Sequence, residues 1–397
     1  MIIAILGFIA FIITFLGVLM GAHFLLYISI IRFFSITNGS ARVYLLSILL
    51  FLSVSFILSA FLVRLHTNSL TSGFYVFSSV WLGLLVHLIM ALAIIWPAYG
   101  LFKISGYVLD TRMISIVCFI LAAAVSLYGI WNAFHPRLKH IVVKIQKLPQ
   151  TWENKTIVQL SDLHLGNIHR KAFMQDVVNR VNGLHPDLIL ITGDLFDGMG
   201  GALASFIEPL NTLEASKGVF FVTGNHEEYL GRRRPLSIVK KTHINILDNR
   251  VVELDGLQIV GISFPKPGSL AAVKSIFGPE GDYNPDKPSI LMYHTPTNIH
   301  SSDNDLGSQH NSIYWSPDTS MRLAKEYGID LQLSGHTHKG QLFPFGWVTK
   351  IIYKGYDYGL HKEGAFTLNT TSGVGTWGPP MRTGSPGEIV VIKLLRS

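Results

Sequence analysis

Cysteine is nearly absent from this chain of 397 residues: Cys118 is the only one, so no intrachain disulfide can form. Charge is also scarce over residues 1–134, which contain only six charged side chains, five of them Lys or Arg. More than half of the net charge of +7 therefore belongs to this apolar part. In residues 135–397 the basic and acidic side chains nearly balance, so their charge gives no sign of a nucleic-acid-binding surface.

Long apolar runs take the place of charge in this first part of the chain. Each of four runs is long enough to cross about 30 Å of hydrocarbon as a helix. The first is too long for a secretory signal and has neither a basic start nor a small-residue cleavage site. We therefore predict that residues 1–134 form a multi-pass membrane region. The predicted spans are about 2–31, 43–63, 74–96 and 113–131.

Basic residues between the predicted spans indicate the side of the membrane on which the rest of the chain lies. The two loops away from the termini carry Arg32, Arg42, Lys103 and Arg112, whereas the loop on the terminal side carries Arg64. This bias predicts an integral protein of the cytoplasmic membrane with an extracytoplasmic soluble domain. Four basic residues just after the fourth span favour the opposite orientation.

Two histidines, His23 and His87, lie inside the predicted spans. A proton or metal path could use such residues, but hydrogen bonds between helices are their commoner role. We therefore expect interhelical hydrogen bonds from both.

From about His140 onward, short apolar runs alternate with helical stretches and turns rich in Gly, Asp and Asn. Most of these runs are apolar on both faces, as in strands at the centre of a covered sheet. Lys171 to Leu184 repeats apolar residues at helical spacing between the first two runs. This order indicates an α/β domain with functional loops at the strand carboxyl ends. The predicted strands are 156–160, 188–192, 219–222, 258–262, 290–293, 331–333 and 389–394.

Polar side chains directly follow five of these predicted strands. The blocks are Asp162-Leu163-His164, Gly193-Asp194-Leu195-Phe196-Asp197, Gly224-Asn225-His226-Glu227, His294 and Gly335-His336-Thr337-His338. Any one block would ordinarily be a helix cap or a turn. Independent turns have no reason to use metal-ligand residue types five times, so we expect these side chains to converge at one edge of the domain.

The blocks offer oxygen and nitrogen donors and no thiolate, which suits Mn²⁺, Fe or Zn²⁺. Seven donors are too many for one tetrahedral ion, but they suit two ions that share a carboxylate. Two such ions acidify a bridging water and neutralise charge on a phosphate. The sequence thus predicts a dinuclear metal centre for phosphoester chemistry.

In this order the five blocks resemble those of the calcineurin-like metallophosphoesterase superfamily. The run from Ile157 to His164, the lead-in Pro186-Asp187-Leu188, and the segments Pro380-Met381-Arg382 and Pro386-Gly387-Glu388 are most similar to its bacterial membrane-associated phosphodiesterase branch. For residues 135–397 the resemblance implies an α/β fold in which two β-sheets pack as a sandwich flanked by helices. It also implies two divalent metal ions as cofactors, of which Mn²⁺ is favoured.

The resemblance assigns a role to each residue of the blocks. The metal ligands would be Asp162, His164 and His338 for one ion, Asn225, His294 and His336 for the other, and Asp194 as the bridge. His226 would contact the phosphate and protonate the leaving group, as a catalytic residue within hydrogen-bond reach. Asp197 and Glu227 would orient the His or Asn ligands.

Four features leave alternatives open. Lys339, where the family usually has Gly, would contact substrate phosphate or point to solvent. Arg382 would bind an anionic group of the substrate or have a role at the protein surface. The polar segment 297–319 would be a solvated insertion or a substrate lid. Arg232-Arg233-Arg234 would be a solvated run or a contact for anionic lipid headgroups.

We therefore predict a membrane-anchored phosphodiesterase or phosphatase that hydrolyses a phosphoester by in-line attack of a metal-bound hydroxide. A lipid- or envelope-derived substrate is favoured, because tethering the site to a bilayer raises the local concentration of such molecules. Membrane lipids are expected partners and nucleic acid is not; the oligomeric state is left open. The alternatives are a non-catalytic sensor or transporter component that binds a phosphorylated ligand, and a nucleotide phosphodiesterase with an incidental anchor.

Overall fold

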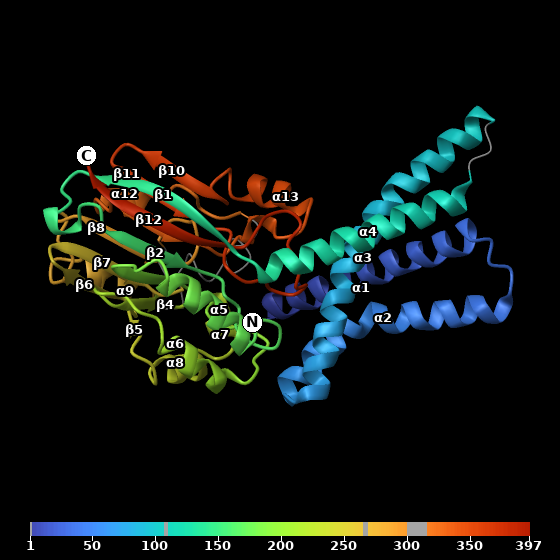
Figure 1. Ribbon diagram of the computed structural model, residues 1–397, viewed down its shortest axis with the longest axis horizontal. Helices are drawn as coiled ribbons and strands as arrows, with labels where there is room; N and C mark the ends of the chain where they lie inside the picture. Colours follow the sequence, from blue (N-terminus) through green and yellow to red (C-terminus); the bar gives the residue numbers. More distant parts are fainter. Residues whose placement is uncertain (1, 107–109, 265–268, 300–315) are drawn as a thin grey trace. The chain divides into compact units, whose positions relative to one another are not determined.

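The structure is a computed structural model that describes residues 2–106, 110–264, 269–299 and 316–397. The chain divides into two compact units. The helical unit contains Met1–Trp131 and Gly378–Met381, and the α/β unit contains Asn132–Trp377 and Arg382–Ser397. The predicted order, four long apolar helices followed by an α/β domain, is confirmed (Figure 1).

Each predicted span corresponds to a helix that is long and apolar enough to cross a membrane. Side chains cap two of them: Asn38 accepts a hydrogen bond from Ala41 N–H, and Asn68 forms a capping box with Thr71. The third helix continues past the predicted end at residue 96, because hydropathy marks the hydrocarbon crossed and not the end of the helix. The helices are α1 (Ile2–Phe33), α2 (Gly39–Leu65), α3 (Ser69–Ser105) and α4 (Thr111–Phe134).

Polar side chains of the helical unit pair between helices. His23 on α1 accepts a hydrogen bond from the indole N–H of Trp81 on α3, at 2.9 Å. The ring of His87 on α3 lies 2.8 Å from the hydroxyl of Ser126 on α4. The expected interhelical hydrogen bonds of both histidines are confirmed.

The α/β unit contains two six-stranded sheets, in the orders β1-β12-β2-β3-β4-β5 and β10-β11-β9-β8-β7-β6. Strands β2, β3 and β4 are parallel in the first sheet, and β7, β8 and β9 are parallel in the second. Their carboxyl ends therefore share one edge of each sheet. The strands are β1 (Arg137–Ile145), β2 (Thr156–Leu160), β3 (Leu188–Thr192), β4 (Val219–Val222), β5 (Asn245–Ile246), β6 (Arg250–Leu254), β7 (Leu257–Ile262), β8 (Ser289–Tyr293), β9 (Leu331–Ser334), β10 (Gly359–Glu363), β11 (Phe366–Thr370) and β12 (Glu388–Arg396).

The two sheets pack face to face as the predicted sandwich. Ile157 and Leu190 of the first sheet share one buried cluster with Ile259 and Met292 of the second. Because strand side chains alternate between faces, the neighbouring residues point outward and are covered by helices. Around the strands lie α5 (Lys171–Asn182), α6 (Ile207–Leu210), α7 (Asn225–Tyr229), α8 (Arg233–Val239), α9 (Ser269–Phe277), α12 (Arg322–Glu326), α13 (Phe345–Ile352) and the 3₁₀ helices η1 (Gln150–Trp152), η2 (Leu203–Phe206) and η3 (His338–Gly340).

The segment 297–319, predicted as a long loop, is described only at its two ends. Asn298 donates a hydrogen bond from its side chain to Asp318, at 2.9 Å, and so joins these ends. Residues 300–315 lie outside the described part of the chain.

Candidate metal centre

All seven predicted metal ligands lie at the carboxyl ends of the parallel strands. The first sheet supplies four and the second supplies three, so the ligands meet where the two sheets' strand ends come together. Asp162 and His164 follow β2, Asp194 follows β3, Asn225 begins α7 after β4, His294 follows β8, and His336 and His338 follow β9.

Most of these ligands have an unusual backbone conformation. Asp162, His164, Asp194, His336 and His338 have φ between 48° and 71°, the left-handed region that favours glycine. Each such residue costs roughly 1–2 kcal/mol relative to ordinary helical backbone. Strain of this kind persists where the surrounding fold dictates it, and it concentrates at functional sites. The sharp turns aim consecutive polar side chains at one point.

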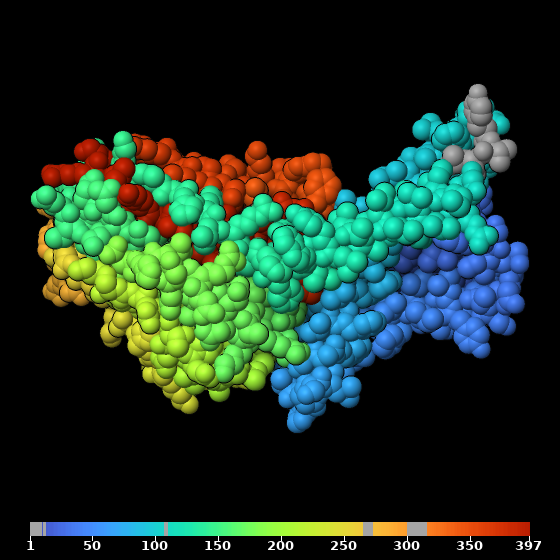
Figure 2. All heavy atoms as spheres, in the orientation of Figure 1, coloured from blue at the N-terminus to red at the C-terminus, as the bar shows by residue number. Residues whose placement is uncertain are grey.

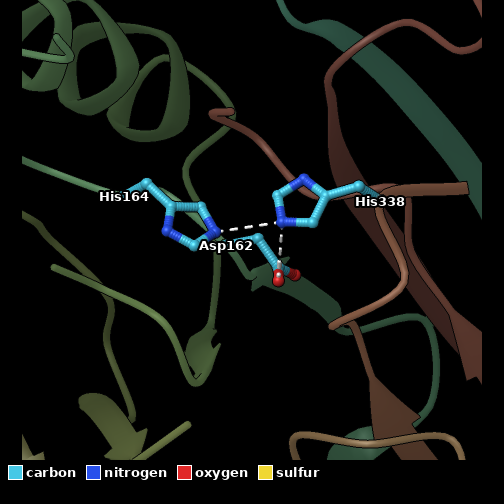
Figure 3. A group of neighbouring side chains, drawn as sticks. All are labelled: Asp162, His164 and His338. Carbon is cyan, nitrogen blue, oxygen red and sulfur yellow. Dashed lines mark hydrogen bonds and ion pairs between the residues drawn. The ribbon is translucent and has the colours of Figure 1, made fainter. Parts of the chain in front are cut away.

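Asp162, His164 and His338 form the first group of ligands (Figure 3). The Nε2 atoms of the two rings lie 3.0 Å apart, and His338 Nε2 lies 3.4 Å from Asp162 Oδ1. Burial lowers the pKa of both histidines well below its usual value, which keeps the rings in the neutral form that binds metal. Burial also raises the pKa of Asp162 to about 6. A carboxylate buried in this way favours a neighbouring cation.

His294, His336 and Asn225 form the second group. Asn225 Oδ1 lies 3.1 Å from His294 Nε2 and 2.9 Å from His336 Nδ1. The His294 Nδ1–H donates to the carbonyl of Thr192 at 2.8 Å, which leaves Nε2 free to face the group. Burial lowers the pKa of His336 to about 3, so this ring is also neutral.

Asp194 lies between the two groups. Its Oδ2 is 3.2 Å from His294 Nε2 and 3.9 Å from His164 Nε2, and its Oδ1 accepts the His226 N–H at 2.8 Å. Burial acts to raise the pKa of Asp194, but His294 and His226 outweigh it and hold the pKa well below its usual range. The ionised carboxylate in turn raises the pKa of His294 to about 9, against the effect of burial.

The residues present fit divalent cations. Carboxylate oxygens and ring nitrogens lie within 4.8 Å of one another in Asp162, His164 and His338, and likewise in Asp194, His294 and His336; these side chains are largely buried and include no thiolate. Buried ionised carboxylates need a compensating charge, and neutral imidazoles are ready to donate lone pairs. Asp162, His164 and His338 could hold one ion, and Asn225, His294 and His336 a second, with Asp194 facing both.

His226 borders this cluster without belonging wholly to either group. Its Nδ1 accepts the Gly198 N–H at 2.9 Å and lies 3.7 Å from Asp197 Oδ1. Burial acts to lower the pKa of His226, but Asp194 and Asp197 outweigh it and raise the pKa. Whether the ring is neutral or charged, its Nε2 carries a proton. The side chain is 12% exposed, so this proton is within reach of a bound molecule.

We had expected Glu227 to orient His or Asn ligand side chains, but its contacts are to the backbone of the site. Its carboxylate accepts N–H bonds from Gly224 at 2.7 Å and from Asp194 and Phe196 at 3.0 Å. It thereby joins the loop after β3 to the loop after β4. Burial and the nearby Asp194 raise its pKa to about 7.

The two predicted substrate contacts lie in other environments. The Lys339 ammonium is 3.9 Å from the centre of the Tyr358 ring, a cation–π contact. Arg382 is completely buried, and its guanidinium donates to main-chain carbonyls, including those of Ser372 and Gly375, at 2.7 and 2.6 Å. We therefore correct its role from substrate clamp to internal support.

Glycines that confine the ligands were not among the predicted site residues. A Cβ at Gly224 would lie 2.2 Å from Asp194 Oδ1, and one at Gly335 would lie 2.1 Å from Asp162 Oδ2. One signal was present in the sequence: Gly immediately precedes a ligand in Gly193-Asp194, Gly224-Asn225 and Gly335-His336. These positions keep the carboxylates in place because only glycine fits there.

Replacing Gly335 by alanine is expected to displace the Asp162 carboxylate and lower hydrolytic activity by about 10²-fold, since small misplacements of reacting groups are costly. Bound metal, measured by plasma mass spectrometry on the full-length protein, should fall in parallel. Gly100→Ala is the matched control, because a Cβ there meets nothing within 4 Å. Unchanged metal content in Gly335→Ala would contradict the confinement.

The family model for calcineurin-like phosphoesterases matches residues 155–340, which include all seven ligands. An uncharacterized metallophosphoesterase of Helicobacter pylori is 33% identical over 276 residues, 67% of either chain. One from Campylobacter jejuni is 33% identical over 298 residues, 72% of this chain and 71% of the relative. A transmembrane protein with metallophosphoesterase domain from Danio rerio is 29% identical over 298 residues, 70% of this chain and 62% of the relative.

The converging strand ends, the clustered metal-ligand side chains and these relatives agree with one another. The four apolar helices, and relatives described as transmembrane proteins, identify a membrane protein. The chain belongs to the calcineurin-like metallophosphoesterases, and it is a metal-dependent phosphoester hydrolase.

Proposed function

We propose that this protein hydrolyses a lipid-linked phosphoester with two divalent ions, Mn²⁺ being favoured. The observation that carries the proposal is the position of Asp194, whose Oδ2 faces ring nitrogens of both ligand groups. When bound, two such ions acidify water and neutralise charge on a phosphate in an in-line displacement. A single carboxylate between two sets of nitrogen donors is suited to this arrangement.

The chain's own groups supply the remaining chemistry. Protonated His226 would donate its Nε2 proton to the leaving oxygen and keep the proton on Nδ1, which leaves a neutral ring. Asp197 beside that nitrogen would stabilise the charged ring before the transfer. Glu227 would hold the Asp194 backbone in its left-handed turn while charge at the site changes.

The lipid-linked character of the substrate rests on the short connection to the membrane helices. Only His135 and Pro136 separate the end of α4 from the start of β1. The α/β unit is therefore tethered to a bilayer, which raises the local concentration of lipid-borne phosphoesters. We place the α/β unit outside the cytoplasmic membrane, following the basic loop residues. A protease added to intact cells should digest the α/β unit. Digestion only in inverted vesicles would show that the unit lies in the cytoplasm.

A substrate panel tests the proposal on full-length protein in detergent with Mn²⁺. A generic aryl phosphodiester should be hydrolysed, chelation should abolish the activity, and lipid-linked phosphoesters should show a higher kcat/KM than water-soluble ones. Preference for nucleotides over lipid-linked compounds would instead support an incidental anchor. No turnover on any phosphoester by metal-loaded protein would support a ligand-binding role.

Replacing His226 by asparagine is expected to slow hydrolysis of substrates with poor leaving groups by about 10²–10⁴-fold, the usual contribution of general acid catalysis. The loss should be much smaller for an aryl ester, whose leaving oxygen needs no proton. Metal content should stay unchanged, because the seven ligands remain. Equal losses for alkyl and aryl esters would argue against proton donation by this residue.

A further inference from the structure

An exposed apolar feature of the α/β unit surrounds α13. None of the residues of this helix is buried, and Trp347 and Ile351 are 66% and 78% exposed. We call the following exposed residues the α13 patch: Phe343, Phe345, Trp347, Val348, Ile351 and Trp377. The surrounding residues, near position 350, form part of the orange-red surface in Figure 2. Soluble proteins seldom leave so many large apolar side chains together on a surface.

The patch is built from two chain segments that are fixed to each other. Gln341 exchanges hydrogen bonds with the backbone of Trp377, accepting its N–H at 3.2 Å and donating to its carbonyl at 3.1 Å. The rings of Phe343 and Trp347 lie edge to face, with centres 5.2 Å apart. The exposed aromatic residues are therefore held in a preformed arrangement.

The chemistry of the patch suits a lipid surface better than a protein partner. From Leu331 to Tyr356 the chain contains no acidic residue, whereas Lys350 and Lys354 are exposed within and just after α13. A short helix with Trp, Phe and Ile beside Lys is typical of segments at the headgroup–acyl boundary. In the alternative basic run, Arg232-Arg233-Arg234, the first residue is already paired with Glu228 and Asp248.

The patch is also joined to the metal centre. The η3 residue Gly340 packs so closely on α13 that a Cβ would lie 2.3 Å from Gly346 N. Thr337, between the ligands His336 and His338, donates to the Asp357 carbonyl at 2.6 Å, and Thr349 of α13 donates to the Asp357 side chain at 3.2 Å. Asp357 therefore connects α13 to the loop that carries His336 and His338 through two hydrogen bonds.

We propose that the α13 patch inserts into the headgroup–acyl boundary of a phospholipid bilayer and presents lipid-linked phosphoesters to the adjacent metal centre. The insertion into the bilayer, which is the first half of the proposal, is argued from the exposed patch, its charge and the two-residue connection between α4 and β1. The presentation of lipid-linked phosphoesters, which is the second half, rests on the proposed function. The occupant to which we commit is the lipid bilayer, and a second copy of the chain is an alternative outcome of the test.

Fluorescence quenching tests the insertion without reference to activity. Full-length protein carrying Cys118→Ser and Ile351→Cys is labelled with an environment-sensitive dye and reconstituted into phosphatidylcholine–phosphatidylglycerol vesicles with doxyl-labelled lipid. The control dye is placed at Asp286→Cys, which is 90% exposed and precedes β8, at the end of the strand opposite His294. We expect at least about twofold stronger quenching at position 351, as for a residue in the acyl boundary.

Equal, weak quenching at both positions would overturn the proposal. So would disulfide cross-linking of two copies through position 351 with no quenching, which would assign the patch to a self-interface. For the second half, Trp347→Asp with Ile351→Asp should lower kcat/KM on vesicle-borne substrate about tenfold and leave the aryl phosphodiester unaffected. Val142→Asp, at a 51% exposed site on β1, is the matched control. Strong quenching without this selective loss would retain the insertion and overturn the substrate role.

Discussion

Asparagine in place of Asp194 should reduce hydrolysis of an aryl phosphodiester by about 10³-fold or more, a loss typical of removing a key electrostatic group from an active site. The substitution keeps the size of the side chain and leaves an oxygen able to accept the His226 N–H. It removes the negative charge of the carboxylate, whose Oδ2 faces both His294 and His164. Without that charge, less would offset the repulsion between two cations held by the two ligand groups.

Metal content distinguishes this explanation from general damage. Asp194→Asn should retain at most about one of the two expected ions, measured by plasma mass spectrometry after exchange into Mn²⁺. Asp286→Asn is the matched control, because that carboxylate is 90% exposed and pairs only at the surface with Lys147. Full occupancy and activity in Asp194→Asn would contradict the bridging position.

The fold was predictable where both faces of a strand are buried. All five residues of β3 and of β8 are buried, and their unbroken apolar letters mark central strands. The missed strands include all four sheet edges, β1, β5, β6 and β10. In β1, Arg137, Leu138 and His140 are exposed and only Val143 and Ile145 are buried, so no long apolar run marks the strand. A strand with one neighbour needs no continuous apolar sequence.

The ligand set was predictable because every ligand directly follows such a central strand. What local sequence could not show is how distant backbone groups complete the site. Glu227 accepts N–H groups from residues over 30 positions away, and no local pattern marks a carboxylate that folds back on main chain. Arg382 is a stronger case, since arginine is almost never fully buried without partners. Its partners are carbonyls of a loop whose path only the tertiary fold decides.

Replacing Arg382 by methionine should lower the free energy of unfolding by about 3–5 kcal/mol, because several buried carbonyls would lose their donor at once. The guanidinium donates to Ser372 at 2.7 Å, to Gly375 at 2.6 Å and to Pro386 at 3.3 Å. Burial lowers the pKa of Arg382 to about 10, so the group stays charged at neutral pH and its hydrogen bonds stay strong. Lysine should not restore the loss, since one ammonium cannot reproduce the planar set of donors.

Thermal unfolding of the full-length protein in detergent measures this effect, with an expected fall in the midpoint of about 10 °C. Arg322→Met is the matched control: that side chain is 58% exposed, pairs with Glu326 one turn away, and should change stability by less than about 0.5 kcal/mol. Because Arg382 Nη2 also lies 3.3 Å from His338 Nδ1, the variant should bind Mn²⁺ more weakly below its unfolding temperature. If Arg382→Met were as stable as the wild type, the loop carbonyls would have other donors. Arg382 would then not be a structural support of the site.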